Sequence, residues 1–248
     1  MKPASRLLKA AFQMIFWAAS IAVLLPMLAG RTLGQGELAP SPALNKQTSL
    51  VRLTMPGWTE KASGNGMRFW HDPDGDVLAL AVLPKKQAYP FTSSETEQRK
   101  WCRREAAVHN AGLIEARAIP SKVGPSASFI YKILQKPAYT YIGQSVTSLH
   151  GATIVWTVIA KEHGTTGVRE AVVTSNLMSS GKLTLDGYEQ AWAQDPYDPA
   201  YHGVDRSVLR FMSDDESYDA QFPSHPLSKV RRALAALPDG AQYDFEAP

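Results

Sequence analysis

Residues 71–76 (His-Asp-Pro-Asp-Gly-Asp) bring three carboxylates and an imidazole together within six positions, a set of donors that suits a hard cation. A calcium-binding EF-hand loop also requires a glycine after its third acid and a later bidentate glutamate, and neither is present. The order Asp-Pro-Asp-Gly is itself typical of a tight turn between two strands. We therefore interpret this segment as a hairpin turn rather than as a metal site.

Ser179 and Cys102 are the two candidate nucleophiles. The Ser-Ser-Gly-Lys sequence that begins at Ser179 matches the S-x-x-K signature of serine–lysine acylases, but the companion S-D-N and K-T-G elements are absent. Cys102 stands beside Arg103 and Arg104, whose charges can lower the pKa of a thiol, yet no histidine or acid lies at a catalytic spacing from it. We interpret Cys102 as a buried apolar residue on the inner face of a helix. We predict that neither side chain is catalytic, and the sequence assigns no cofactor-binding residue.

The segment from Asp195 to Asp219 is the most acidic part of the chain, with seven acids against Arg206 and Arg210. Tyrosines are interleaved with these acids, and tyrosine is frequent at protein interfaces. The simplest interpretation is a solvated loop. The alternatives are a loop stiffened by calcium and a recognition surface for a basic partner. That surface would consist of Asp195, Tyr197, Asp198, Tyr201, Asp214, Asp215 and Tyr218.

The first 36 residues direct the chain to a membrane. Three basic residues precede an apolar run from Ala10 to Gly30, and no acidic residue occurs before Glu37. A basic segment stays in the cytoplasm while the apolar run enters the bilayer, so everything after Glu37 is expected outside the cytoplasm. The run is long enough to span a bilayer as a helix of about 20 residues, and the small residues that follow it also suit a signal peptidase. A retained transmembrane anchor and a cleaved signal peptide both stay open.

The exported part is expected to be one domain of nearly balanced charge. Residues 1–36 hold four of the 26 Lys and Arg residues and no acid, so 22 basic residues face 23 acidic ones beyond them. The overall excess of positive charge therefore belongs to the N-terminal segment and does not indicate a nucleic-acid partner. Pro40 and Pro42, among small polar residues, mark residues 37–49 as a tether. Residues 50–248 are long enough for a single domain with an acidic insertion at about 195–219.

Proline, glycine and hydrophobic periodicity divide residues 50–248 into an α+β pattern. A capping box of Ser94 and Glu97 begins a helix whose inner face carries Trp101, Cys102 and Val108. Strands are predicted at 50–55, 66–71, 77–83, 129–134, near 139–141, at 154–159 and at 168–174, and later helices at 185–192 and 226–237. Short connections favour an antiparallel β-sheet meander covered by helices.

The order of these elements resembles a known fold. A strand that ends in the Pro-Gly-Trp turn at Pro56, a hairpin, one long helix, a β-meander and a terminal helix are similar to the Mog1/PsbP/DcrB-like sandwich. The resemblance extends over about residues 50–237, and the acidic stretch is a departure from it. It implies a binding or assembly module without shared catalytic residues, so it transfers no site residue to this chain.

Taken together, these patterns favour an exported, non-enzymatic binding or assembly module that contacts another protein of the cell envelope. The expected location is the periplasm, free or anchored in the inner membrane with the domain outside the cytoplasm. The alternative from another class is a periplasmic hydrolase whose active-site residues do not form a recognisable motif. Convergent polar side chains in a deep pocket would favour the enzyme, and an aromatic patch or flat sheet edge would favour the binding module.

An alkaline phosphatase fusion tests the predicted orientation. Fused after Gly36, the enzyme is expected to be active, because all charge that flanks the apolar run on its N-terminal side is positive. A fusion placed before Ala10 serves as the inactive control. An inactive Gly36 fusion that is expressed at the same level would contradict the orientation.

Overall fold

The computed structural model describes residues 48–64, 67–84, 94–119, 121, 124–149 and 152–244. The predicted membrane segment and the first eleven residues of the tether lie outside this part of the chain. No helix within the described residues has the length and apolar character needed to cross a membrane.

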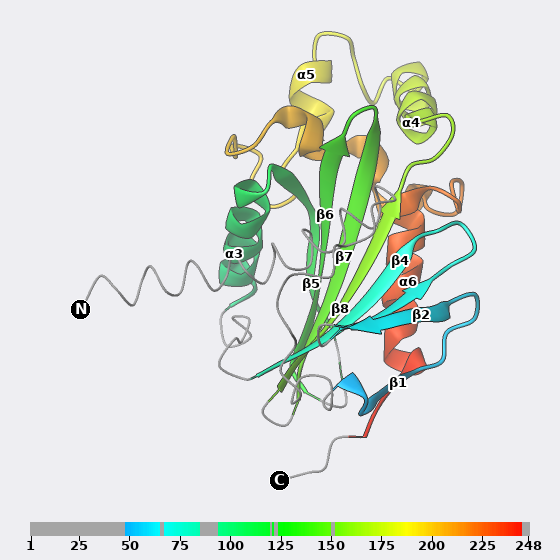
Figure 1. The fold of residues 1–248 in the computed structure, drawn as a ribbon. Helices are drawn as coiled ribbons and strands as arrows, with labels where there is room; N and C mark the ends of the chain where they lie inside the picture. Colours follow the sequence, from blue (N-terminus) through cyan, green and yellow to red (C-terminus); the bar gives the residue numbers. More distant parts are fainter. Residues whose placement is uncertain are drawn as a thin grey trace, which may run out of the picture. The chain divides into compact units, whose positions relative to one another are not determined.

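The described residues form an α+β fold around a seven-stranded antiparallel sheet, in the order β2-β3-β4-β8-β7-β6-β5 (Figure 1). Its strands are β2 (Thr59–Gly64), β3 (Met67–His71), β4 (Val77–Pro84), β5 (Ala111–Ile119), β6 (Ser126–Gln135), β7 (Ala138–Leu149) and β8 (Ala152–Lys161). Strand β8 is central, as its run of apolar residues predicts, because both of its faces are buried. The 72–75 segment forms the expected turn between β3 and β4, with Gly75 at a positive φ of 87°.

Two short strand pairs lie outside this sheet. The predicted strand 50–55 is β1 (Val51–Leu53), which pairs with β11 (Ala241–Tyr243) near the C-terminus instead of joining the large sheet. Strands β9 (Ala193–Gln194) and β10 (Arg210–Phe211) form the second pair within the acidic segment. Both pairings join segments that are distant in sequence, so local patterning could not specify them.

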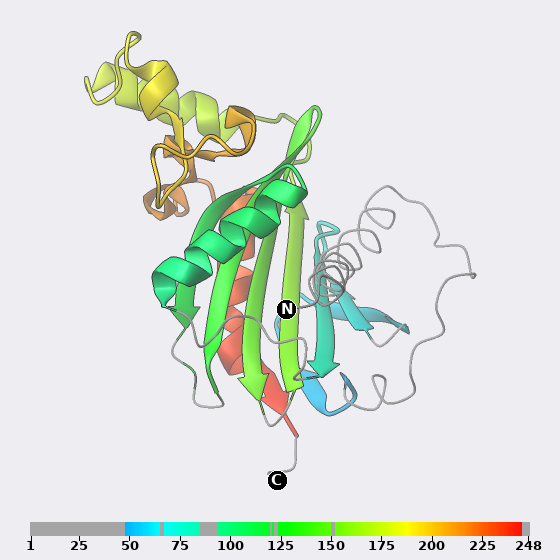
Figure 2. The same cartoon turned by 90° about the vertical axis from the view of Figure 1, so that its left-hand side faces the viewer.

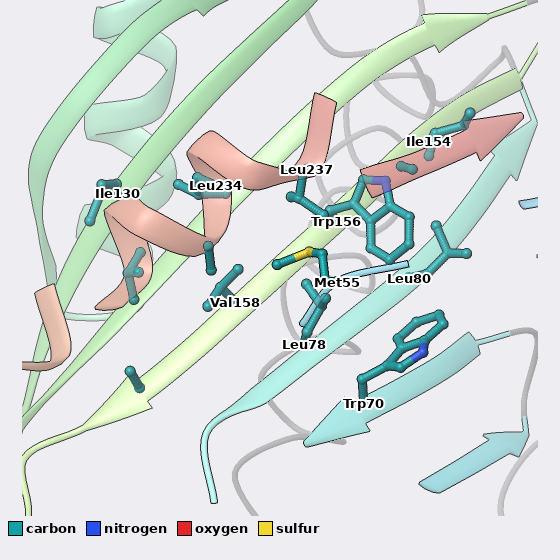
Figure 3. Close-up of a cluster of buried hydrophobic side chains, with 14 of the residues drawn as sticks. Met55, Trp70, Leu78, Leu80, Ile130, Ile154, Trp156, Val158, Leu234 and Leu237 are labelled. Atoms are coloured by element: carbon teal, nitrogen blue, oxygen red, sulfur yellow. The ribbon is translucent and has the colours of Figure 1, made fainter. Parts of the chain in front are cut away.

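Helix α6 (Pro226–Gly240) covers one face of the sheet and closes the main core. Its predicted stripe of Leu227, Val230, Leu234 and Leu237 is buried against β7 and β8. Figure 3 shows Leu234 and Leu237 above Trp156 and Val158 of β8. Close approach is required here, because a side chain at Gly143 would collide with the helix residues Val230 and Leu234.

Helix α3 (Glu95–Val108) lies on the opposite face from α6 (Figure 2). The predicted cap is confirmed, since Ser94 Oγ accepts a hydrogen bond from the backbone N–H of Glu97 at 3.3 Å. Cys102 is fully buried, and the half-buried ring of Trp101 lies 6.3 Å from that of Phe129. The assignment of Val108 to the inner face was wrong: its side chain is 60% exposed, because the helix ends there.

Two further predictions fail in the C-terminal third of the chain. Residues 168–174 are not a strand but the first part of helix α4 (Val168–Ser179), which buries Arg169, Val173 and Leu177 at helical spacing. The left-handed Gly167, with a φ of 75°, turns the chain out of the sheet before that helix. The predicted helix 185–192 shrinks to the single turn α5 (Tyr188–Ala191), and Leu185 is 82% exposed.

Truncation of Leu237 tests the core assignment of α6. Leu237→Ala is expected to lower the free energy of unfolding by about 2–5 kcal/mol, because the buried side chain leaves a cavity between helix and sheet. Leu185→Ala, at an exposed position, is the matched control and should change it by less than about 0.5 kcal/mol. Equal denaturation midpoints for the two variants would contradict the packing described here.

Candidate functional site

Residues 162–225 form a cap at one end of the sheet, next to the start of β7 and the end of β8. Figures 1 and 2 show α4 and α5 beyond that end, joined to the sheet by the loop that follows β8. The cap also contains three single-turn 3₁₀ helices: η2 (Arg206–Val208), η3 (Met212–Asp214) and η4 (Glu216–Tyr218). Its own apolar cluster includes Val173, Leu177, Trp192 and Phe211. The cap is therefore a packed unit and not a solvated loop.

A buried ion pair joins the cap to the sheet. Lys132 of β6 and Asp214 of η3 have no solvent-exposed side-chain surface, and Lys132 Nζ lies 2.7 Å from an Asp214 carboxylate oxygen. The same carboxylate accepts hydrogen bonds from the Tyr141 hydroxyl at 3.1 Å and from the Phe211 backbone N–H at 2.8 Å. Burial alone would raise the pKa of Asp214, but the charge and hydrogen bond of Lys132, together with the hydrogen bonds from Phe211 and Tyr141, more than offset it, so this pKa lies below its ordinary value of 3.8.

Two arginines fasten the same segment to the helices. Arg169 of α4 is fully buried and donates to the carbonyl oxygen of Ser213 at 2.6 Å and to the carboxylate of Asp219 at 3.0 Å. Arg231 of α6 donates to the Asp214 carbonyl at 2.7 Å and to the same Asp219 carboxylate at 3.0 Å. A planar guanidinium with five donors suits this kind of multiple contact. The 213–219 backbone is thus held in a fixed position against both helices.

An open groove of about 630 Å³ lies between α4 and the aromatic side of the cap. One wall is the helix face of Ala171, Thr174, Ser175 and Met178. The rest of the lining comprises Tyr139, Gly167, Glu170, Tyr188, Trp192 and Phe211. The aromatic residues are in mutual contact: Trp192 stacks on Tyr188 at 5.5 Å and on Phe211 at 5.6 Å, and Tyr139 meets Phe211 edge-on. Such a stack is a rigid apolar surface with little conformational entropy to lose on contact.

Three polar side chains, Glu162, Glu170 and His225, meet beside the inner end of this groove. His225 Nε2 lies 3.8 Å from a carboxylate oxygen of Glu162 and 3.9 Å from one of Glu170. Glu162 is held in place, since its carboxylate accepts hydrogen bonds from the backbone N–H groups of Tyr139 at 2.8 Å and Gly167 at 3.2 Å. The groove and the polar cluster share Glu170, so together they form the candidate site.

Burial controls the charge state of these groups. Burial and then the nearby carboxylates of Asp214 and Glu162 raise the pKa of Glu170 above 4.5. Burial and then the charge of Arg169 lower the pKa of His225 to about 3, so its imidazole is neutral at physiological pH. Burial, with the charges of Glu170 and Asp214, raises the pKa of Tyr139 to about 12. The site therefore presents a neutral imidazole and a neutral phenol beside the carboxyl group of Glu170, whose pKa is raised.

The predicted recognition residues of the acidic segment mostly contact this chain itself. Asp195 forms a bidentate ion pair with Arg103 of α3, at 2.7 and 2.9 Å, and Asp198 joins the same guanidinium at 3.3 Å. The Tyr197 hydroxyl accepts from the Ala116 N–H at 2.7 Å and donates to its carbonyl at 3.0 Å, so it covers part of the edge strand β5. The acidic segment thus matches its charges to basic residues of the domain.

The other predicted recognition residues of the acidic segment differ in how much of their side chains is exposed to solvent. Asp214 is buried in the ion pair described above, whereas Asp215 pairs with Arg210 at 2.9 Å and keeps a 48% exposed side chain. Tyr201 and Tyr218 pack against the apolar cluster of the cap, and the guanidinium of Arg103 lies 4.8 Å from the Tyr201 ring centre. The structure brings these residues into one cap, but only part of the set offers exposed atoms to a partner.

The other chemistry-bearing segments are also used internally. Asp72, Asp74 and Asp76 surround the ammonium group of Lys229 on α6, which takes the place that a hard cation would fill. Burial raises the pKa of the Cys102 thiol to about 12, so the folded protein holds it as a thiol rather than a nucleophilic thiolate. Ser179 is exposed at the end of α4 and does not line the groove.

Sequence reasoning did not identify Glu162, Glu170, His225 or Lys132 as members of a site. Glu162 and His225 lay in segments interpreted as a turn and as the start of a helix, and Lys132 in an alternating strand pattern. One signal was available: Glu170 and Arg169 lie among apolar residues of a segment with helical spacing. Because that segment was assigned to a strand, the face that carries them was not recognised.

Comparisons with known proteins find similarity among solved structures, including Mog1 proteins. No protein-family model and no curated protein matches the sequence. Among solved structures, the chain is similar to the Ran-binding protein Mog1p of Saccharomyces cerevisiae, with 9% identity, a TM-score of 0.35, and coverage of 65% of this chain and 94% of that one. It is also similar to LpqN of Mycobacterium tuberculosis, described as involved in cell envelope biogenesis, with 11% identity, a TM-score of 0.29, and coverage of 53% and 78%. These likenesses concern the fold, and no site residue is taken from them.

Removal of one buried charge tests the joint between cap and sheet. Asp214→Asn is expected to lower the free energy of unfolding by about 3–5 kcal/mol at pH 7, because it leaves the Lys132 ammonium buried without a counter-charge. Asp186→Asn, at an exposed position, is the matched control. The double variant K132M/D214N removes both charges and should be more stable than D214N alone. A double variant no more stable than D214N would contradict this account.

The same pair predicts a pH dependence. The folded-state pKa of Asp214 lies below its ordinary value of 3.8, so its stabilising contribution is complete above that value and is lost as the pH falls. The difference in unfolding free energy between the wild type and Asp214→Asn should therefore be largest near neutral pH and shrink below about pH 4. Denaturant titrations at pH 7, 5 and 3 measure it, and a difference independent of pH would contradict the assignment.

Proposed function

We propose that this protein is an exported, non-enzymatic binding or assembly module of the cell envelope that contacts another protein through the groove between α4 and the aromatic wall. The observation that carries the proposal is the open hollow of about 630 Å³ whose inner wall is the stacked series Tyr188, Trp192 and Phe211. Tyr188 is half-buried, and Trp192 and Phe211 keep only 7% and 9% of their surface exposed at the bottom of the hollow. Aromatic residues and methionine are the residue types enriched at the centres of protein interfaces. In the groove they gather around a concave surface.

The shape and lining of the groove fit an extended segment of a partner protein with an apolar or aromatic anchor. One wall is a helix face with small side chains, which allows a backbone to approach, and the other wall is aromatic. Aromatic-lined grooves of this kind recognise extended and proline-rich segments. The cap that forms the wall is fixed by the Lys132–Asp214 pair and by Arg169, so little ordering is needed when a partner binds.

The exposed carboxylates of Asp198 and Asp215 extend this proposed surface. Their side chains are 45% and 48% exposed, and each already pairs with an arginine of this chain. A basic residue of the partner would therefore compete with Arg103 or Arg210, and its contribution to affinity would be small compared with that of the groove. We assign the main contact to the groove and a steering role to these acids.

The location follows from the N-terminal sequence and not from the fold. Basic residues before a long apolar run and the absence of acids before Glu37 support export, with the domain on the periplasmic side, free or attached to the inner membrane. A partner is then an envelope protein. The nearly balanced charge of residues 37–248 gives no support to a nucleic-acid partner.

A hydrolase is less well supported by the geometry of the groove. Thr174 and Ser175 supply hydroxyl groups to its wall, but both carboxylate oxygens of Glu170 lack a hydrogen-bond partner. A hydroxyl nucleophile needs a hydrogen-bonded base to activate it. The described residues of the groove do not assemble that pair, which favours binding over acyl transfer.

A bulky residue in the groove tests the proposal. Ser175→Trp is expected to abolish capture of the partner by filling the hollow, whereas Asn176→Trp, on the exposed side of α4, should leave it unchanged. Because both positions are exposed, both variants should keep the wild-type unfolding midpoint within about 0.5 kcal/mol.

Photo-crosslinking in intact cells gives the measurement. A photoreactive side chain at Met178, inside the groove, should yield one defined adduct that Ser175→Trp removes and Asn176→Trp retains. The same group at Ser179, outside the groove, is the control position. Adducts of equal yield at both positions, or an adduct unaffected by Ser175→Trp, would exclude the groove as the contact.

A further inference from the structure

Three side chains of ligand type converge from three separate elements of the described chain. Glu162 directly follows β8, Glu170 lies in the first turn of α4, and His225 caps the N-terminus of α6. His225 Nε2 is 3.8 Å from Glu162 and 3.9 Å from Glu170, and one potential ligand atom from each residue lies within 4.8 Å of the other two. His225 thus joins two residues that precede it by more than 50 positions and that are eight positions apart from each other.

The atoms at this point lack hydrogen-bond partners. Both carboxylate oxygens of Glu170 and Nε2 of His225 are buried without one, and the His225 side chain is only 8% exposed. Buried polar groups in folded proteins nearly always find a partner. Among the described residues, no lysine or arginine lies within ion-pair distance of Glu162 or Glu170; only the imidazole of His225 does. The cluster therefore has unused ligand atoms and no lysine or arginine in ion-pair contact with its carboxyl groups, while the charge of Lys132 acts on Glu170 from a longer distance. This arrangement points to a ligand that carries positive charge.

We propose that Glu162, Glu170 and His225 bind one divalent transition-metal ion, of which Zn²⁺ fits the donor set. Imidazole nitrogen and carboxylate oxygen are ordinary zinc ligands, whereas Ca²⁺ takes six to eight oxygen ligands and has no use for an imidazole. Zinc–ligand distances near 2.1 Å place two ligand atoms of a tetrahedral site about 3.4 Å apart. The separations of 3.8 and 3.9 Å from His225 need to close by about half an ångström, and the Glu162 and Glu170 oxygens, which lie within 4.8 Å of each other, by at most about 1.4 Å.

Hydrogen bonds to Glu162 support metal binding, whereas the hydrogen bond that His225 accepts from Leu227 would be lost on metal binding. The Tyr139 and Gly167 N–H groups orient the Glu162 carboxylate, as hydrogen bonds behind metal ligands commonly do. His225 Nδ1 accepts a 3.3 Å hydrogen bond from the Leu227 N–H, which places the ring proton on Nε2 in the metal-free protein. Metal binding at Nε2 moves that proton to Nδ1 and ends this cap. The stability lost with this single 3.3 Å capping hydrogen bond is small compared with the free energy gained when three protein ligands bind a metal ion.

Three protein ligands leave one position of a tetrahedral ion open for water or for an atom of another molecule. Glu170 also lines the groove, so a bound ion would lie next to the proposed partner site. The metal site goes beyond the proposed binding function, and neither depends on the other. A groove that binds its partner without metal, or a metal site without a partner, would leave the other proposal intact.

Zinc titration of the full chain, freed of metal with a chelator, tests the proposal. We expect one equivalent of Zn²⁺ to bind by calorimetry and to raise the thermal unfolding midpoint, because it binds only the folded arrangement. Glu170→Gln removes one ligand at constant size, and His225→Asn removes the imidazole while asparagine remains a favourable N-cap. Changing a residue that only hydrogen-bonds to a metal ligand lowers metal affinity by about 10–100-fold. Each of these two variants removes a ligand itself, so each should lower the affinity for zinc by more than that. His163→Asn, on the exposed neighbouring loop, is the control and should bind as the wild type.

The ring proton of His225 provides a second readout that a purely structural role would not change. Nitrogen-15 NMR should show Nδ1 unprotonated without zinc and protonated with it. Millimolar Ca²⁺ should produce neither the NMR change nor the stabilisation. No saturable zinc binding, zinc binding retained in both ligand variants, or calcium stabilisation lost in Glu170→Gln alone would each overturn the proposal.

Discussion

The ion pair between Lys132 and Asp214 is the constraint on which the cap depends. It joins β6 to a segment 82 residues later, with both charges removed from water. A buried pair of this kind contributes little net stability, because desolvation offsets most of the attraction, but any arrangement that separates the two charges is strongly disfavoured. The pair therefore specifies where the cap lies rather than how stable the domain is. Tyr141 and the Phe211 N–H complete the coordination of the carboxylate and fix its orientation.

The position of Phe211 follows directly from this constraint. Its N–H binds Asp214, and its ring lies 3.2 Å from Lys132 Nζ on one side while it stacks on Trp192 on the other. The aromatic wall of the groove is thus built outward from the buried charge pair, in the order Phe211, Trp192, Tyr188. The proposed binding function rests on this rigid aromatic wall beside a helix with small side chains.

The cluster of Glu162, Glu170 and His225 differs from the Lys132–Asp214 ion pair in how far its polar atoms find hydrogen-bond partners. Lys132 and Asp214 satisfy each other, whereas Glu170 and His225, whose side chains are 14% and 8% exposed, keep buried atoms without a hydrogen-bond partner. The domain pairs acids of the acidic segment with basic residues and surrounds Lys229 with three aspartates, so Glu170 and His225 belong to a small set of buried polar groups that it leaves unpartnered. Exceptions to satisfied burial concentrate at functional sites, because a ligand completes them. Groove and cluster meet at Glu170, so a partner and an ion would act at adjacent positions.

Local sequence patterns determined much of the framework. The alternation in β6, the doubly apolar β8, the Ser94 cap, the Asp-Pro-Asp-Gly turn and the stripe of α6 were all predicted, because each depends on residues within a few positions of one another. The prediction that the domain is exported rests on the N-terminal sequence alone.

The tertiary structure decided the rest, since it depends on pairings between distant segments. Residues 168–174 became a helix because Gly167 turns the chain out of the sheet and the helical face of Arg169, Val173 and Leu177 packs into the cap. The acids of 195–219 resembled a free patch because their partners Arg103, Lys132 and Arg231 lie on other elements. The charge on a segment can be read from its sequence. Whether that charge faces solvent, an arginine or an ion depends on what the fold places opposite it.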